Sequence, residues 1–151
     1  MLSERACAPA PGRGMMEAFP LWCGRFAVTT FFAIAFLQSA ADKVIDRQGN
    51  LEYLTGHFAS SPLRGLVQPL FWAITALEAI AGVLCGLGAL CLLLGCGTGM
   101  ALWGLLFVLI ALLCLFFGQR LAKDYGGAMV LTSYYAVAIL GLILLGMKST
   151  S

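Results

Sequence analysis

The run from Ala79 to Gln119 contains no Asp, Glu, Lys or Arg residue. A helix that crosses a bilayer needs about 20 mainly apolar residues, so this run is long enough for two crossings. The glycine-rich segment Gly95–Gly99 lies inside it, and glycine is both a poor helix former and a favoured turn residue. The sequence therefore predicts two membrane spans, over about 69–94 and 100–118, joined by a tight turn.

Two further stretches complete the expected set of spans. Residues 126–147 form another uncharged run, which predicts the last span. A first span over about 21–45 is weaker and requires Arg25 to extend its side chain to the headgroups. The alternative for this region is a signal peptide cleaved near Ser39-Ala40-Ala41. Residues 1–20 are expected to be a flexible N-terminal tail, followed by one membrane domain over 21–148.

The composition supports this assignment. The chain is 61% hydrophobic and 11% charged, whereas soluble domains carry roughly 25% charged residues. The net charge of +2 is too small and scattered for a nucleic-acid surface. Because only helices and closed barrels satisfy their backbone in lipid, and these runs are too long for barrel strands, the predicted fold is all-α: an integral membrane four-helix bundle.

One short segment between the first two spans is predicted to lie on the membrane interface. Leu51, Leu54 and Phe58 give it an apolar side, and Pro62 is expected to end it. The even number of spans puts both termini on the same side of the membrane. The basic residues divide almost evenly between the two sides, so the orientation stays open.

Glu78 is the polar residue that most needs an explanation. It lies about nine residues into the expected second span, roughly 13 Å along the helix axis, where an acid exposed to lipid is costly. Matching of depth suggests Tyr134 and Tyr135 as hydrogen-bond partners in the bundle interior. The alternatives are an intramembrane polar pocket, formed by Glu78 with these tyrosines, that handles a proton or binds a headgroup, and a bond to Thr75.

A second polar group is expected at the membrane face where the second span begins. The end of the first span and the segment after the third meet there. We expect either a packing clamp made of ion pairs or a polar mouth that accepts a headgroup such as a quinone ring. The residues of this expected polar mouth are Asp42, Lys43, Gln119, Arg120, Lys123 and Asp124.

The six cysteines include no Cys-x-x-Cys pair, so a dithiol redox motif is absent. Cys85 and Cys114 fall deep in spans and are expected to be small apolar fillers. A disulfide between Cys23 and Cys96 stays a minor alternative. His57 has no histidine partner, and no metal site is expected.

The Gly82-x-x-x-Gly86 spacing in the second span permits close approach of a neighbouring helix. It indicates packing rather than chemistry. The Gly-rich turn before Met100 is not a phosphate loop, because no strand precedes it and no lysine follows it in the motif position.

Several of these residues resemble motifs of the DoxX family of membrane proteins. The first span reads Arg25, Phe32 and then Ser39–Lys43, similar to the family's Arg…Phe…Ser-Gly-x-x-Lys pattern, with alanine in place of the glycine. The second span, Leu77–Gly88, resembles the family's acid followed by glycines and leucines. The segment Gly118–Tyr125 resembles one found in some members.

The resemblance implies a four-helix membrane bundle and says less about activity, because redox complexes are the setting of only some members. Some relatives are subunits of a thiosulfate:quinone oxidoreductase, and others belong to complexes that handle thiol or oxidative stress. The chain is thus expected to be a non-catalytic or quinone-contacting subunit, with Glu78 handling a proton, Tyr134 or Tyr135 bonding the headgroup, and Lys43 and Arg120 holding the mouth. The alternative is a membrane scaffold or assembly factor without redox chemistry.

Cofactors and partners follow from this expectation. The chain carries no cofactor motif of its own, and a quinone is the expected ligand. Electrons would come from a redox-enzyme partner in a bacterial inner (plasma) membrane. The lipid bilayer is the other expected partner, nucleic acid is not expected, and a homo-oligomer is compatible with the sequence.

Overall fold

The structure, a computed structural model, describes residues 13–147, with side chains from Phe19 onward. Four helices in it are long and apolar enough to cross a membrane. The predicted all-α four-helix membrane bundle is therefore confirmed, and a short fifth helix lies between the first two spans. The helices are α1 (Arg13–Ile45), α2 (Arg47–His57), α3 (Val67–Leu93), α4 (Gly99–Leu121) and α5 (Tyr125–Gly146).

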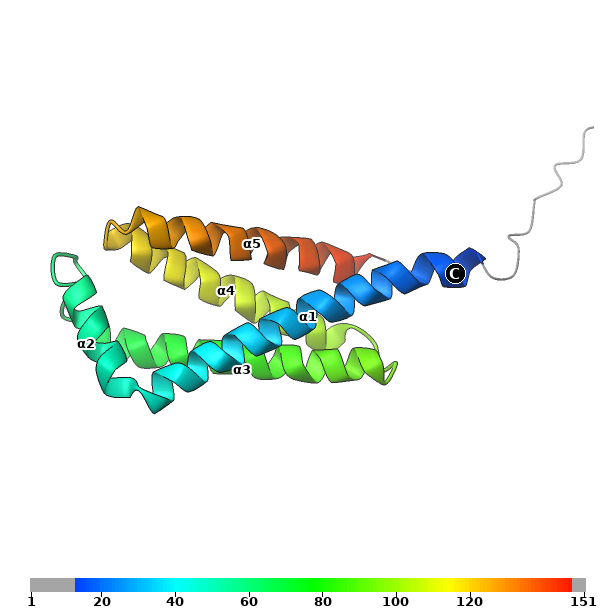
Figure 1. The fold of residues 1–151 in the computed structure, drawn as a ribbon, viewed down its shortest axis with the longest axis horizontal. Helices are drawn as coiled ribbons and strands as arrows, with labels where there is room; N and C mark the ends of the chain where they lie inside the picture. The colour runs from blue at the N-terminus through cyan, green and yellow to red at the C-terminus, as the bar shows by residue number, and fades with distance from the viewer. Residues whose placement is uncertain (1–12, 148–151) are drawn as a thin grey trace, which may run out of the picture.

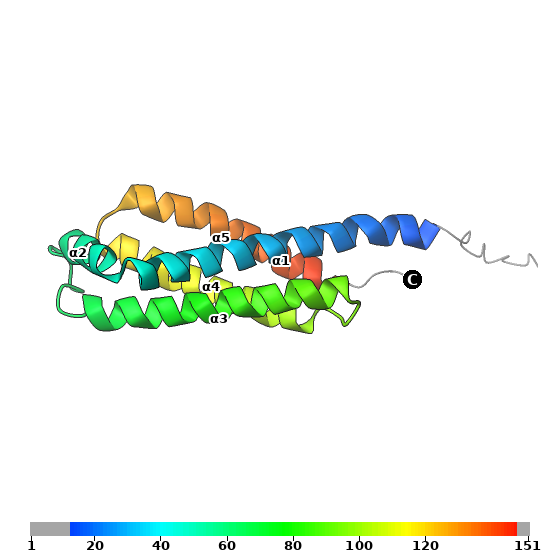
Figure 2. The same cartoon turned by 60° about the horizontal axis from the view of Figure 1, so that its bottom comes forward.

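The four long helices run along one axis as antiparallel sequence neighbours, and α2 crosses one end of the bundle (Figures 1 and 2). We call this the α2 end; it also holds the end of α1, the start of α3 and the α4–α5 turn. Helix α3 packs against both α1 and α4, and α4 packs against α5. The far end holds the last residues of α5, beside the first half of α1, as an even number of spans requires.

Glycine and aspartate residues shape the connections. Gly95 and Gly97 have φ angles of 72° and 100°, in the left-handed region that glycine enters without steric cost, so the predicted turn between α3 and α4 is present. Asp124 caps α5 by accepting a hydrogen bond of 2.9 Å from the Gly127 amide. Asp46 caps α2 in the same way.

Helix α2 corresponds to the short segment expected between the first two spans. It contains no buried residue. Leu51 and Leu54 are half-buried, whereas Glu52 and Tyr53 are exposed. The prediction that Pro62 ends it is wrong: the helix already ends at His57, and a series of turns leads from there to α3.

Small residues bring the backbones of α3 and α4 into contact. A Cβ atom on Gly88 would lie 2.6 Å from the Cα of Ala101, and one on Gly104 would lie 2.7 Å from the backbone nitrogen of Cys85. Lipid is as apolar as leucine, so helices in a bilayer associate through close packing of this kind. These two glycines therefore set the distance between α3 and α4.

The predicted Gly82-x-x-x-Gly86 contact surface is only half correct. Gly82 faces α1, and a Cβ atom on it would lie 2.8 Å from the backbone nitrogen of Leu37. Gly86 has nothing within 4 Å of its Cβ position. The second close approach of α3 uses Gly88 instead, on the side that faces α4.

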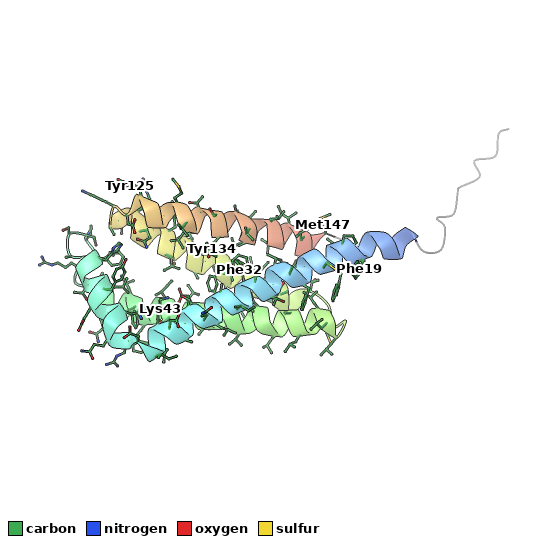
Figure 3. The ribbon with its side chains drawn as sticks, in the orientation of Figure 1. Phe19, Phe32, Lys43, Tyr125, Tyr134 and Met147 are labelled. Atoms are coloured by element: carbon green, nitrogen blue, oxygen red, sulfur yellow. The ribbon has the colours of Figure 1, made fainter. Side chains whose placement is uncertain are left out.

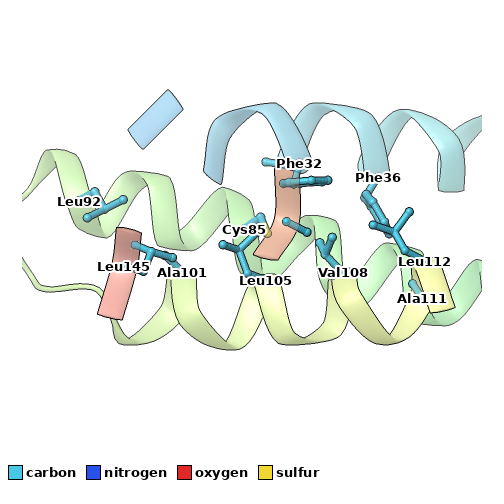
Figure 4. Packing of buried hydrophobic residues seen from close by; sticks show 13 residues of the cluster. Phe32, Phe36, Cys85, Leu92, Ala101, Leu105, Val108, Ala111, Leu112 and Leu145 are labelled. Atoms are coloured by element: carbon cyan, nitrogen blue, oxygen red, sulfur yellow. The ribbon is translucent and has the colours of Figure 1, made fainter. Parts of the chain in front are cut away.

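Apolar side chains fill the centre of the bundle between these backbone contacts. Phe32 of α1, Cys85 of α3 and Leu105 and Val108 of α4 are fully buried and lie side by side (Figure 4). Cys85 is thus a small core residue, as predicted. Cys114, in contrast, is exposed on the outer surface of α4 and is not part of the core.

Arg25 has a different role from the one expected. Its Nε donates a hydrogen bond of 2.8 Å to the Leu144 carbonyl, and a second guanidinium nitrogen donates to the Met147 carbonyl. The last carbonyls of a helix have no partner within that helix. Arg25 therefore ties α1 to the end of α5 rather than extending to headgroups.

Candidate functional site

The side chain of Glu78 is only 2% exposed, and it pairs with a lysine of the neighbouring helix. The Lys43 ammonium nitrogen, Nζ, lies 2.8 Å from Glu78 Oε2. Glu78 is on α3 and Lys43 is in the last turn of α1. The side chain of Lys43 is 17% exposed, and Figure 3 shows this residue near the α2 end. One acid and one base thus meet at the contact between α1 and α3.

Ser39 completes this site. It precedes Lys43 by four residues on α1, so the two side chains share a helix face. Lys43 Nζ donates to Ser39 Oγ over 2.7 Å, and Ser39 Oγ donates to Glu78 Oε2 over 3.2 Å. Both donors end on the same carboxylate oxygen, and no described residue hydrogen-bonds Glu78 Oε1. We call these three residues the Ser–Lys–Glu site.

The electrostatics of the site follow from its composition. The ionised pair has no net charge, so neither charge is left uncompensated inside the bundle. A buried pair gains little stability overall, because desolvation offsets the attraction, but the loss of one partner is strongly destabilising. Two of the three Lys43 N–H groups are used within the site, so the free Oε1 atom and the partly exposed ammonium group leave one acceptor and one N–H donor for a ligand.

The expected tyrosine partners of Glu78 lie elsewhere. Tyr134 is exposed and stacks on Phe31, with 5.9 Å between the ring centroids. Tyr135 is half-buried against the apolar core. Among the residues that the structure describes, the Glu78 side chain forms hydrogen bonds only with Ser39 and Lys43, so neither tyrosine hydroxyl is its partner. Thr75, the other alternative, donates over 2.7 Å to the Phe71 carbonyl of its own helix.

Sequence reasoning missed that Lys43 and Ser39 bind Glu78. It placed Lys43 in the polar mouth, because the lysine is close to the end of α1 and the acid is deep in α3. The contact depends on how far the two helices overlap, which depth counting alone does not give. One usable signal was present: Ser39, Lys43 and Glu78 all belong to the motifs that carry the DoxX resemblance.

The other residues expected in the polar mouth do not form one group, because α2 lies across the α2 end of the bundle, between the end of α1 and the end of α4. Among the described residues, no ion pair joins the end of α1 to the end of α4. Instead His57 Nε2 lies 3.0 Å from Gln119 Oε1 and 3.8 Å from Asp124 Oδ2. Asp42 and Lys123 are exposed. His57 thus closes α2 onto the α4–α5 turn, rather than standing alone in a loop.

Arg120 does not join the His57 contacts. It lines a groove of about 560 Å³ between α4 and α5. Its guanidinium carbon is 4.8 Å from the centre of the Tyr125 ring. Thr132, Ser133, Phe116 and Met129 also line this groove, which we call the α4–α5 groove.

The structure also locates the residues considered for redox and metal chemistry. Cys23 and Cys96 are both free thiols, so they form no disulfide with each other. Among the side chains of residues 19–147, no three from His, Cys, Asp or Glu are placed to hold a metal ion. Cys7 lies outside the described residues.

Comparison with known proteins gave no relative. No family model, no curated protein and no solved structure matches this chain. The DoxX resemblance therefore depends on the motif residues alone.

Proposed function

We propose that this chain is a DoxX-like membrane subunit of a redox complex and that it contacts a quinone at the Ser–Lys–Glu site. The observation that supports this most is the meeting of Ser39, Lys43 and Glu78. These residues carry the resemblance, come from two spans, and are held by hydrogen bonds of 2.7–3.2 Å. Motif residues that converge on one buried carboxylate are better explained by a shared site than by separate packing needs.

The chemistry of quinone reduction fits the groups present. Conversion of a quinone to a quinol takes two electrons and two protons. The ammonium group of Lys43 is the exposed part of the site, and it can donate a hydrogen bond to a quinone carbonyl oxygen. Ser39 and the Glu78 carboxylate accept hydrogen bonds from Lys43 and hold its ammonium group in position. The paired carboxylate carries no proton to give, so a proton that Lys43 passes to the quinone is replaced from water. The electrons come from a partner subunit that oxidises thiosulfate or a thiol, in a bacterial plasma membrane.

The test must separate quinone contact from folding, because loss of either charged partner destabilises the bundle. The variant Lys43→Met/Glu78→Leu replaces the pair by apolar side chains of similar size, a change that is often neutral for stability. We expect this double variant to fold but to lose ubiquinone binding, measured by equilibrium dialysis in nanodiscs. Asp42→Asn, next to Lys43 but exposed, is the control and should bind ubiquinone normally.

A membrane scaffold or assembly factor is the second candidate. It is favoured by the neutralisation of Glu78 within the chain itself, since a clamp between α1 and α3 requires nothing else. In that case the double variant would fold, the unaltered chain would bind no ubiquinone, and gentle purification from membranes would recover client proteins without a redox enzyme. That result would replace the proposed function.

A further inference from the structure

The α4–α5 groove lies on a different side of the bundle from the Ser–Lys–Glu site. It opens between two helices at the α2 end, whereas the Ser–Lys–Glu site lies between α1 and α3. Its rim is polar, with Arg120 and Tyr125, and Phe116 and Met129 contribute apolar walls. A groove on a membrane protein with one charged end and apolar walls has the same polarity pattern as a single lipid molecule.

The charge at the rim is positive and is not neutralised. Arg120 is exposed, and no acidic side chain of the described residues lies within 4.0 Å of its guanidinium group. Asp124 is the nearest acid in sequence, but its carboxylate faces other groups. Its Oδ1 atom accepts a hydrogen bond from the Gly127 amide, and its Oδ2 atom lies 3.8 Å from His57 Nε2. The Tyr125 ring holds the guanidinium group in place through a cation–π contact.

Hydroxyl groups continue the groove toward the membrane interior. Thr132 and Ser133 lie about two helix turns, or roughly 10 Å, beyond Tyr125 along α5. Thr132 donates to the Ala128 carbonyl over 2.9 Å, whereas the exposed Ser133 makes no hydrogen bond to a described residue. The Ser133 hydroxyl is thus available to an ester carbonyl that lies deeper than a phosphate bound at Arg120.

We infer that the α4–α5 groove binds one anionic phospholipid, with its phosphate on Arg120, its glycerol ester at Ser133 and an acyl chain along Phe116 and Met129. The planar guanidinium group suits a phosphate because it can form two parallel hydrogen bonds with it. A quinone fits less well, since its neutral ring makes no use of the unpaired charge. The inference does not depend on the proposed function, because the two sites share no residue.

The experiment measures lipid binding to the full chain in detergent by native mass spectrometry. We expect phosphatidylglycerol to be retained in preference to phosphatidylcholine. Arg120→Gln should weaken phosphatidylglycerol binding about tenfold, as expected for the loss of one charge-assisted contact. Arg64→Gln removes an exposed cation of the α2–α3 connection at the same end and should leave binding unchanged.

A second pair of variants fills the groove without a change of charge. Ala136 lines the groove, and Ala136→Phe should reduce phosphatidylglycerol retention as strongly as Arg120→Gln. Ala76→Phe adds the same ring at an exposed position of α3 and should have no effect. Equal retention of both lipids, an equal loss with Arg64→Gln, or selective retention of ubiquinone that Ala136→Phe abolishes would each overturn the inference.

Discussion

Charged side chains are paired on one side of this bundle and unpaired on the other. On the α1–α3 side, the buried Glu78 carboxylate is paired at 2.8 Å with the partly exposed Lys43 ammonium group, so each charge has its counter-charge within the chain. On the α4–α5 side, Arg120 is exposed and has only an aromatic ring beside it. The α1–α3 side is also packed more tightly, since α3 contains ten buried residues and α5 contains four.

The difference shows what depth in the membrane requires of a charged residue. An acid deep in a span must find its counter-charge within the chain, since lipid tails offer none. A cation near the end of a span can instead use a lipid phosphate as its counter-charge. The tightly packed side should therefore be sensitive to single substitutions, and the open side should tolerate them while responding to lipid.

The largest effect is expected when one partner of the buried pair is removed. Lys43→Met leaves the Glu78 carboxylate without a counter-charge and should lower the free energy of unfolding by about 3–5 kcal/mol. Denaturation in mixed micelles measures this change. The Lys43→Met/Glu78→Leu variant should recover most of the loss. A single variant as stable as the unaltered chain would show that Glu78 needs no partner.

A smaller loss is expected from crowding the contact between α3 and α4. The new Cβ of Gly88→Ala would meet the backbone of Ala101, which cannot move as a side-chain end can. The cost should be about 1–3 kcal/mol, measured in the same micelles. Gly86→Ala is the matched control: its Cβ meets nothing, so the variant should gain about 0.5–1 kcal/mol from helix propensity. Equal behaviour of the two variants would mean that α3 and α4 are not in close contact.

A third effect should be confined to the α2 end. His57→Ala removes the contact with Gln119, worth about 1 kcal/mol, which holds α2 to the α4–α5 turn. Amide hydrogen exchange in α2 should accelerate by roughly fivefold, while exchange in α3 stays unchanged. Thr55→Ala is the control, because the Thr55 hydroxyl bonds only its own helix. Faster exchange throughout the bundle would show that His57 supports more than α2.

The sequence was sufficient for the spans because long apolar runs and a glycine-rich turn are local signals. The start of α3 at Val67 and the end of α4 at Leu121 differ by only a few residues from the predicted limits. The partners of Glu78 are a different kind of problem. A one-turn change in the overlap of two helices exchanges one partner for another, and the sequence does not encode that overlap at any single position. The partners of Lys43 and of Arg25 could not be predicted for this reason.

The smallest effect is expected from removal of the Tyr134 hydroxyl on α5. Its ring stacks on Phe31, and its hydroxyl makes no hydrogen bond to a described residue. Tyr134→Phe keeps the ring and should leave the free energy of unfolding and ubiquinone binding unchanged. Tyr134→Ala removes the aromatic pair and should cost about 0.5–1.5 kcal/mol beyond the lost contact area. If Tyr134→Phe lowered ubiquinone binding, the phenol would belong to the proposed quinone site, and Glu78 would have to exchange Lys43 for a tyrosine when the ligand binds. The contrast between the two sides would then be a property of the unliganded bundle alone.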